Sequence, residues 1–437
     1  MDREVPLIAL LLPAALAAPA SSAPIDAAAV FGPLAHGAHA REPVALAGSG
    51  ARYLDVYKSG DLAILHDADG EWLAEALAQG GDPMVWILGS LETAFYKKFD
   101  DDYQYITVLM VMDLGFFFAF YSPMANDVRG IGYDSMFSNE VFDTSGNQLD
   151  GFIFMNYYGL WAENPAVGRY VFGQEFMHRW GSFTNIDKEG LATDALLGRD
   201  TAHWSYYLHT PNSPMEGNTW LDNADGTWTT ENEGVSTYSD LDLYLMGLVG
   251  PEEVGEQTLL LVDDADAAAA VVEPASTPEF LDRYSGGTNV TLPATPVTFT
   301  VDDIIAAEGE RVPSAADSPK DFRMAFLVLV LSEDTFGDAE IAAIDGVRRT
   351  FEADWEEDVG YRADLDTTLG NSTASTWGEP LDTGEAEDTD TVDCCKDDGE
   401  GEAAAACGCA SSTKPDGFAL AALALVGLVG ARREVRS

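Results

Sequence analysis

The residues best suited to chemistry lie in one short stretch, Val171 to Gly181 (VFGQEFMHRWG). On a helix, Gln174 and His178 would share one face, about 5–6 Å apart at Cβ. When both positions are histidines, the two imidazoles can bind one Zn²⁺, and a glutamate after the first can activate the metal-bound water. Glu175 and His178 fit this pattern, whereas Gln174 offers a neutral carboxamide. The stretch predicts either an altered metal site or an ordinary amphipathic helix with Glu175 and His178 exposed.

Several segments around this helix, in a fixed order, resemble a group of exported bacterial zincin-like metallopeptidases. They are NDVRGIG at 126–132, HWS at 203–205, SPMEGN at 213–218, DNADGT at 222–227 and YSDLDLYLMGL at 238–248. The resemblance spans roughly residues 90–370. It implies an α+β fold with a zincin-like mixed sheet, an active-site helix and a C-terminal strand–helix unit. It also implies Zn²⁺-dependent hydrolysis of peptide bonds in a protein or peptide substrate.

By position, the resemblance makes Glu175 the general base and His178 the second zinc ligand, with Gln174 where the first zinc histidine is expected. Thr184 stands at the third-histidine position of the extended H-E-x-x-H-x-x-G-x-x-H motif, so that version does not apply. Loss of one imidazole lowers zinc affinity, because zinc sites use imidazole, thiolate or carboxylate ligands. Two functions therefore stay open: an active metallopeptidase, and an inactive pseudo-peptidase that serves as a surface binding or structural protein.

A third metal ligand must come from downstream in the chain. Asp242 is the first choice, as a carboxylate beside the YLMGL segment, ahead of His203 and then Asp240. Asp242 is equally well explained as a solvated acid at the start of a helix, near the positive end of the helix dipole. Met246 could form an apolar floor beneath the site, and Tyr244 could stabilise an oxyanion, although both residue types more often pack in a core.

Two acidic turns offer hard oxygen ligands of the kind that Ca²⁺ prefers. They are DNADG at 222–226 and HDADG at 66–70. Neither fits the full 12-residue EF-hand pattern, and Asp and Asn also occur in such turns because they hydrogen-bond to nearby backbone amides. Turn formation is the favoured interpretation, and Ca²⁺ binding is the alternative.

Charge and cysteine usage exclude several functions. The 437 residues carry a formal net charge of −51, with 23 Lys and Arg against 74 Asp and Glu. Nucleic-acid binding needs a basic surface, so no nucleic-acid partner is expected. All four cysteines lie after residue 393, so a thiol nucleophile and disulfides are excluded from the globular part. The strong acidity also suggests adaptation to high salt or divalent cations, which screen self-repulsion.

The two ends predict export and attachment to the cell envelope. Residues 1–24 have the apolar run and small residues of a signal peptide, and 25–50 form an Ala/Gly/Pro-rich linker. A peptidase-like domain over 51–370 is followed by an acidic disordered linker over 371–406. Residues 407–437 combine Cys-Gly-Cys, an apolar stretch and terminal arginines, and so resemble the myxobacterial C-terminal sorting signal. The protein is therefore expected at the cell surface, at the outer membrane or outside the cell.

Hydrophobic periodicity and turn residues predict the elements that would hold these groups in place. The predicted helices cover 83–99, 167–183 and 338–358, and a short helix or turn is predicted at 240–248. Buried strands are predicted within 103–120, at 151–158 and at 322–331. Residues 200–235, rich in Asn, Asp, Gly and Trp, are predicted to form a long ordered loop.

Overall fold

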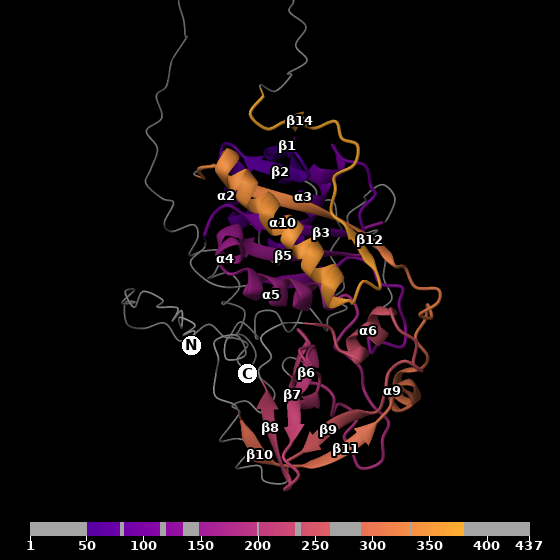
Figure 1. Cartoon of the computed structure of the whole chain (residues 1–437). Helices are drawn as coiled ribbons and strands as arrows, with labels where there is room; N and C mark the ends of the chain where they lie inside the picture. The colour runs from indigo at the N-terminus through magenta and orange to yellow at the C-terminus, as the bar shows by residue number, and fades with distance from the viewer. Residues whose placement is uncertain are drawn as a thin grey trace, which may run out of the picture.

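A computed structural model of the chain describes residues 50–78, 83–113, 119–133, 148–198, 201–231, 237–262, 290–332 and 334–379. Within these ranges the chain forms seven helices and two mixed β-sheets, which confirms the α+β class. Figure 1 shows the larger sheet in the upper half of the molecule and the smaller sheet in the lower half. The predicted signal peptide and the C-terminal apolar stretch lie outside the described residues.

The larger sheet has eight strands, four of which are mainly buried. They are β1 (Asp55–Ser59), β2 (Leu62–Asp67), β3 (Tyr105–Met110), β4 (Phe120–Pro123), β5 (Gly151–Tyr157), β12 (Asp321–Leu331), β13 (Asp364–Asp366) and β14 (Ser375–Thr376). The order is β14-β1-β2-β12-β3-β5-β4, and β13 pairs with the start of β12. Strands β2, β12, β3 and β5 run parallel, whereas β1 is antiparallel to β2 and parallel to β14, and β4 is antiparallel to β5. The apolar sequences of β3 and β12 suit strands that are buried on both faces.

Helices cover both faces of this sheet (Figure 1). Helices α2 (Glu71–Ala78) and α3 (Pro83–Tyr96) lie on one face, and α4 (Tyr158–Glu163), α5 (Pro165–Met177) and α10 (Asp338–Asp358) lie on the other. Alternate residues of β12 enter the two cores, because successive side chains of a strand point to opposite faces. Phe326 and Val328 pack toward α5 and α10, and Leu327 and Leu329 pack toward α2 and α3.

The smaller sheet shows that the loop predicted over 200–235 is wrong. It contains β6 (Trp204–His209), β7 (Glu216–Asp222), β8 (Thr227–Glu231), β9 (Gln257–Leu261), β10 (Thr291–Pro293) and β11 (Thr295–Phe299), in the order β10-β8-β7-β6-β9-β11. Its strands are short, and Asn, Asp and Gly occupy the turns between them. Tyr206, Trp220, Leu260 and Leu292 form a small core of their own. Helices α6 (Asp240–Met246) and α9 (Val301–Glu308) lie beside this sheet (Figure 1).

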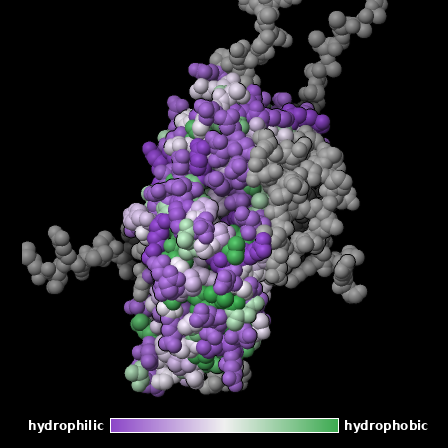
Figure 2. All heavy atoms as spheres, turned by 90° about the vertical axis from the view of Figure 1, so that its right-hand side faces the viewer, coloured by the Kyte–Doolittle hydropathy of each residue, from purple (hydrophilic) through white to green (hydrophobic). Residues whose placement is uncertain are grey.

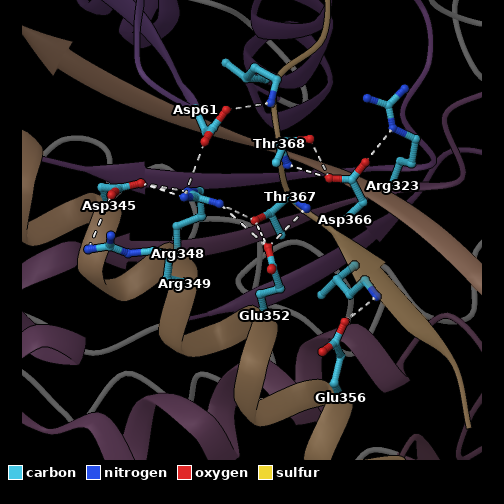
Figure 3. A network of polar contacts seen from close by, with 12 residues as sticks. Asp61, Arg323, Asp345, Arg348, Arg349, Glu352, Glu356, Asp366, Thr367 and Thr368 are labelled. Atoms are coloured by element: carbon cyan, nitrogen blue, oxygen red, sulfur yellow. Dashed lines mark hydrogen bonds and ion pairs between the residues drawn. The ribbon is translucent and has the colours of Figure 1, made fainter. Parts of the chain in front are cut away.

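The C-terminal part of the fold follows the prediction closely and then extends past it. Strand β12 and helix α10 form the expected strand–helix unit. The domain boundary predicted at residue 370 is too early, because β14 pairs with β1 and Trp377 packs against Tyr57 and His66. Between β13 and β14 the chain crosses α10, where Thr367 accepts a hydrogen bond from the buried Arg348 (Figure 3).

The surface agrees with the acidic composition. Figure 2 shows that the face turned toward its viewer is mainly polar over the larger sheet, with apolar residues gathered in the lower half. None of the described helices is long and apolar enough to cross a membrane.

Candidate functional site

Helix α5 is held firmly at the boundary between the larger sheet and the segments that lead to the smaller one (Figure 1). Phe172 stacks on Phe351 of α10, with 4.5 Å between ring centroids, and Phe176 lies 5.1 Å from Trp355. Aromatic contacts of this kind bury large apolar surfaces and fix the orientation of a helix. The same helix carries Gln174, which meets the segment that begins β6.

Gln174, His178 and His203 converge on one place. The Nε2 atoms of Gln174 and His203 are 3.2 Å apart, although the two residues are 29 positions apart in the sequence. The imidazole rings of His178 and His203 meet edge to face, with 4.9 Å between centroids and an interplanar angle of 86°. Five residues were candidate metal ligands, and the structure brings three of them together. Gln174 and His178 come from α5 and its C-terminal cap, and His203 comes from a separate segment.

The end of α5 sets the orientation of His178. The predicted helix over 167–183 ends early, at Met177, and His178 is its C-terminal cap residue. The Nδ1 atom of His178 lies 3.2 Å from the backbone oxygen of Gly181. A proton on Nδ1, donated to that carbonyl, places the lone pair of the imidazole on Nε2. This tautomer is the one that metal-binding histidines use when Nε2 is the ligand.

Glu175 lies on the same turn, one residue after Gln174 and three before His178. It is buried, with 5% of its surface exposed, and His178 is partly buried. The alternative of an exposed Glu175–His178 pair on an ordinary surface helix therefore does not hold. Residues three apart on a helix are neighbours, so Glu175 and His178 extend from adjacent positions at the end of α5.

Two separations among these side chains agree with a shared tetrahedral metal. Two atoms bound to one zinc at bond lengths of about 2.0–2.1 Å lie about 3.3 Å apart, and two such imidazoles have centroids about 5 Å apart. The observed separations are 3.2 Å and 4.9 Å. A half-turn of the Gln174 carboxamide would present Oε1 as the ligand in place of Nε2. Within the described ranges no three His, Cys, Asp or Glu side chains could hold one ion, so a metal here depends on Gln174.

Asp242, the first choice for a third ligand, occupies a different place. It lies in the first turn of α6, where its Oδ2 accepts hydrogen bonds from the amide and the hydroxyl of Ser239, both at 2.7 Å. Its Oδ1 accepts from the Trp204 indole at 2.8 Å. Burial raises the pKa of Asp242, and hydrogen bonds from Ser213, Trp204 and Ser239 lower it. These oxygens complete the helix cap, so Asp242 is the helix-start acid of the alternative interpretation, although it is buried and not solvated.

The other candidates on α6 have surroundings of their own. Asp240 is exposed in the first turn. Met246 is fully buried, and its backbone oxygen accepts a hydrogen bond from Arg311. Burial raises the pKa of Tyr244, and the neighbouring Arg311 lowers it. Tyr244 and Met246 therefore pack in the core beside Arg311.

Both acidic turns use their carboxylates for local hydrogen bonds. Asp67 is fully buried and accepts the backbone amides of Trp72 and Leu73 at the start of α2. Asp222 accepts the amide of Ala224, and Asp225 accepts the amide and hydroxyl of Thr227. This is the turn chemistry that competed with Ca²⁺ binding in the sequence interpretation.

Arg179 is a site-adjacent residue to which the sequence interpretation assigned no role. It is almost fully buried, donates to Asn126 at 2.7 Å and lies 3.6 Å from the carboxylate of Asp150. Burial raises the pKa of Asp150, whereas Arg179 lowers it. Arg179 ties the residue after His178 to the entrance of β5. The motif comparison already contained the signal, since Asn126 and Arg179 belong to two of the segments that carry the resemblance.

Comparison of the chain with models of protein families, with curated proteins and with solved structures found no match.

Proposed function

We propose that this protein is a zincin-type, metal-dependent hydrolase of peptide bonds, with its metal held by His178, His203 and Gln174. The observation that carries the proposal is the approach of His203 to Gln174 and His178 from the separate segment that leads into β6. If the Gln-Glu-x-x-His sequence occurred in this helix by chance, there would be no reason to expect a second histidine at ligand distance from it. The zincin-like fold and the peptidase activity are proposed together, on this convergence and on the ordered motifs of the sequence.

The roles of the side chains follow from their chemistry. Bound at this place, Zn²⁺ would supply Lewis acidity, which polarises a peptide carbonyl and makes water more acidic. Glu175 would act as the general base, taking a proton from the attacking water and passing it to the leaving amine. His178, whose Nδ1 lies against the Gly181 carbonyl, would offer Nε2 as its ligand atom. The Gln174 carboxamide supplies the weakest ligand of the three, so we expect lower zinc affinity than for a three-imidazole site.

An inactive pseudo-peptidase is the second candidate, and one contact favours it. The carboxamide of Gln174 lies within hydrogen-bond distance of the His203 ring. That contact satisfies both groups without a metal, so the fold does not need an ion to keep these buried polar side chains paired. In this case the domain would bind or support another molecule at the surface.

Metal content and proteolysis separate the two candidates. We expect purified protein to hold near-stoichiometric zinc, to lose it in His178→Ala and His203→Ala, and to keep it in His66→Ala, a histidine of β2. We expect casein cleavage that Glu175→Gln abolishes. Zinc content no higher in the wild type than in His178→Ala would refute the hydrolase, and Gln174→His should then create a tighter site if only this ligand is missing.

We also propose that the protein works outside the cytoplasm, attached to the cell envelope through its C-terminal segment. The support is the apolar N-terminal run and the Cys-Gly-Cys, apolar and arginine-rich C-terminal segment. Fractionation of the producing cells tests this: the wild-type protein should be in the envelope, and a chain that ends at residue 406 should be released. Recovery of both in the cytoplasm would refute it.

A further inference from the structure

Trp204 and Asp242 form a buried contact directly behind the candidate site. The Trp204 indole nitrogen donates to Asp242 Oδ1 at 2.8 Å, and neither residue has measurable exposed surface. Trp204 follows His203 in the chain and begins β6. The residue that sequence interpretation put forward as a metal ligand is therefore bonded to the neighbour of a site histidine.

Asp242 is itself rigidly held. It is the third residue of α6 and forms a complete capping box with Ser239, whose hydroxyl accepts from the Asp242 amide at 3.3 Å. The side chain of Ser213, from the segment that precedes β7, adds a further hydrogen bond. A carboxylate fixed by several donors in a buried site has little freedom to move. The indole that it holds is fixed with it.

The orientation of Trp204 bears on His203 because the two residues share one peptide unit, in the bend that leads into β6. Trp204 points toward α6, and His203 points toward Gln174 of α5. The backbone between them is held by hydrogen bonds from Gly198 to the His203 oxygen at 2.8 Å and from the Trp204 amide to Met215 at 2.9 Å. A backbone rotation between these two residues that released the indole would also turn the imidazole away from Gln174.

We propose that Asp242 is a positioning residue, which holds the Trp204 indole and thereby sets the His203 ring against Gln174 and His178. The proposal rests on the proposed metal site for its zinc readout, and a second readout is independent of metal. Asp242 acts as a support behind the ligands, in the way that outer contacts orient metal-binding histidines.

The test compares Trp204→Phe with Trp72→Phe. Trp72, on the opposite face of the larger sheet, is 2% exposed, and its indole donates to Ser90 at 2.7 Å. Each variant loses one buried indole donor and keeps an aromatic ring, so their losses of stability should be similar. Only Trp204→Phe should raise the rate at which diethyl pyrocarbonate modifies His203 in metal-free protein, read residue by residue by mass spectrometry.

Zinc affinity, measured by competition with a chromophoric chelator, should fall about 10–100-fold in Trp204→Phe, and stay within twofold of the wild type in Trp72→Phe. Asp242→Asn should reproduce both effects and provides a second variant if Trp204→Phe folds poorly. Unchanged His203 protection or unchanged zinc affinity in Trp204→Phe would overturn the proposal. If the wild type binds no zinc, the proposed function fails, and His203 protection alone decides the positioning role.

Discussion

Arg348 of α10 is the centre of a network that attaches the C-terminal segment to the larger sheet (Figure 3). Its side chain is 6% exposed and approaches Asp345 at 2.8 Å, Thr367 at 2.5 Å, and both Asp61 and Glu352 at 3.6 Å. These partners come from α10, from the turn between β1 and β2, and from the chain between β13 and β14. Replacement of Arg348 by Ala should therefore loosen three parts of the fold at once.

The size of the effect can be worked from burial. Removing one member of a buried ion pair costs about 3–5 kcal/mol. The carboxylates of Asp345, Glu352 and Asp61 are 28%, 33% and 36% exposed, so water can partly solvate them after the mutation. We therefore expect Arg348→Ala to lower the free energy of unfolding by about 2–3 kcal/mol.

The adjacent Arg349 provides a matched control. It pairs with the same Asp345 at 3.4 Å, but its side chain is 65% exposed. An exposed pair of this kind contributes about 0.2–1 kcal/mol. Equilibrium urea unfolding of the wild type, Arg348→Ala and Arg349→Ala at neutral pH measures both losses. Hydrogen exchange should also become faster over residues 364–376 in Arg348→Ala only. Losses of equal size in the two variants would refute the reasoning that burial decides the contribution.

Three further predictions concern stability. Burial raises the pKa of Asp358 to about 7, although the paired Arg169 lowers it. Since the unfolded value is near 4, this group should make the protein lose stability as pH rises from about 4 to 7, by up to about 4 kcal/mol. Urea titrations of Asp358→Asn should lack that part of the pH dependence, and an unchanged slope would contradict it. Gly247 has φ of 77°, and a Cβ atom added there would clash with Ser318. Gly247→Ala should therefore lower the melting temperature and reduce the free energy of unfolding by about 2 kcal/mol or more. A reduction of the free energy of unfolding below about 0.5 kcal/mol would count against this strain. The net charge of −51 predicts that NaCl raises the melting temperature by screening self-repulsion, and a flat salt response would disprove that.

Much of the secondary structure could be predicted from the sequence because its local patterns agree with the tertiary context. The apolar residues of 322–331 predict a buried strand, and β12 is buried on both faces. The periodic apolar residues of 338–358 predict a helix, and α10 has those bounds. Long periodic segments carry enough information by themselves, because each apolar position repeats the same preference. The strands within 200–235 are short and rich in polar residues, and two of them, β6 and β8, also pair with the distant strands β9 and β10.

The sequence alone determined which side chains could do chemistry in α5, since the spacing of Gln174, Glu175 and His178 follows from helical geometry. It could not decide between Asp242 and His203, because the choice depends on which way each side chain points after the chain has folded. The tertiary structure separates the two residues: Asp242 faces inward to cap α6 and hold an indole, whereas His203 faces Gln174 of α5. Both residue types can bind zinc, but here they have different neighbours, and neighbours distant in sequence are set by packing.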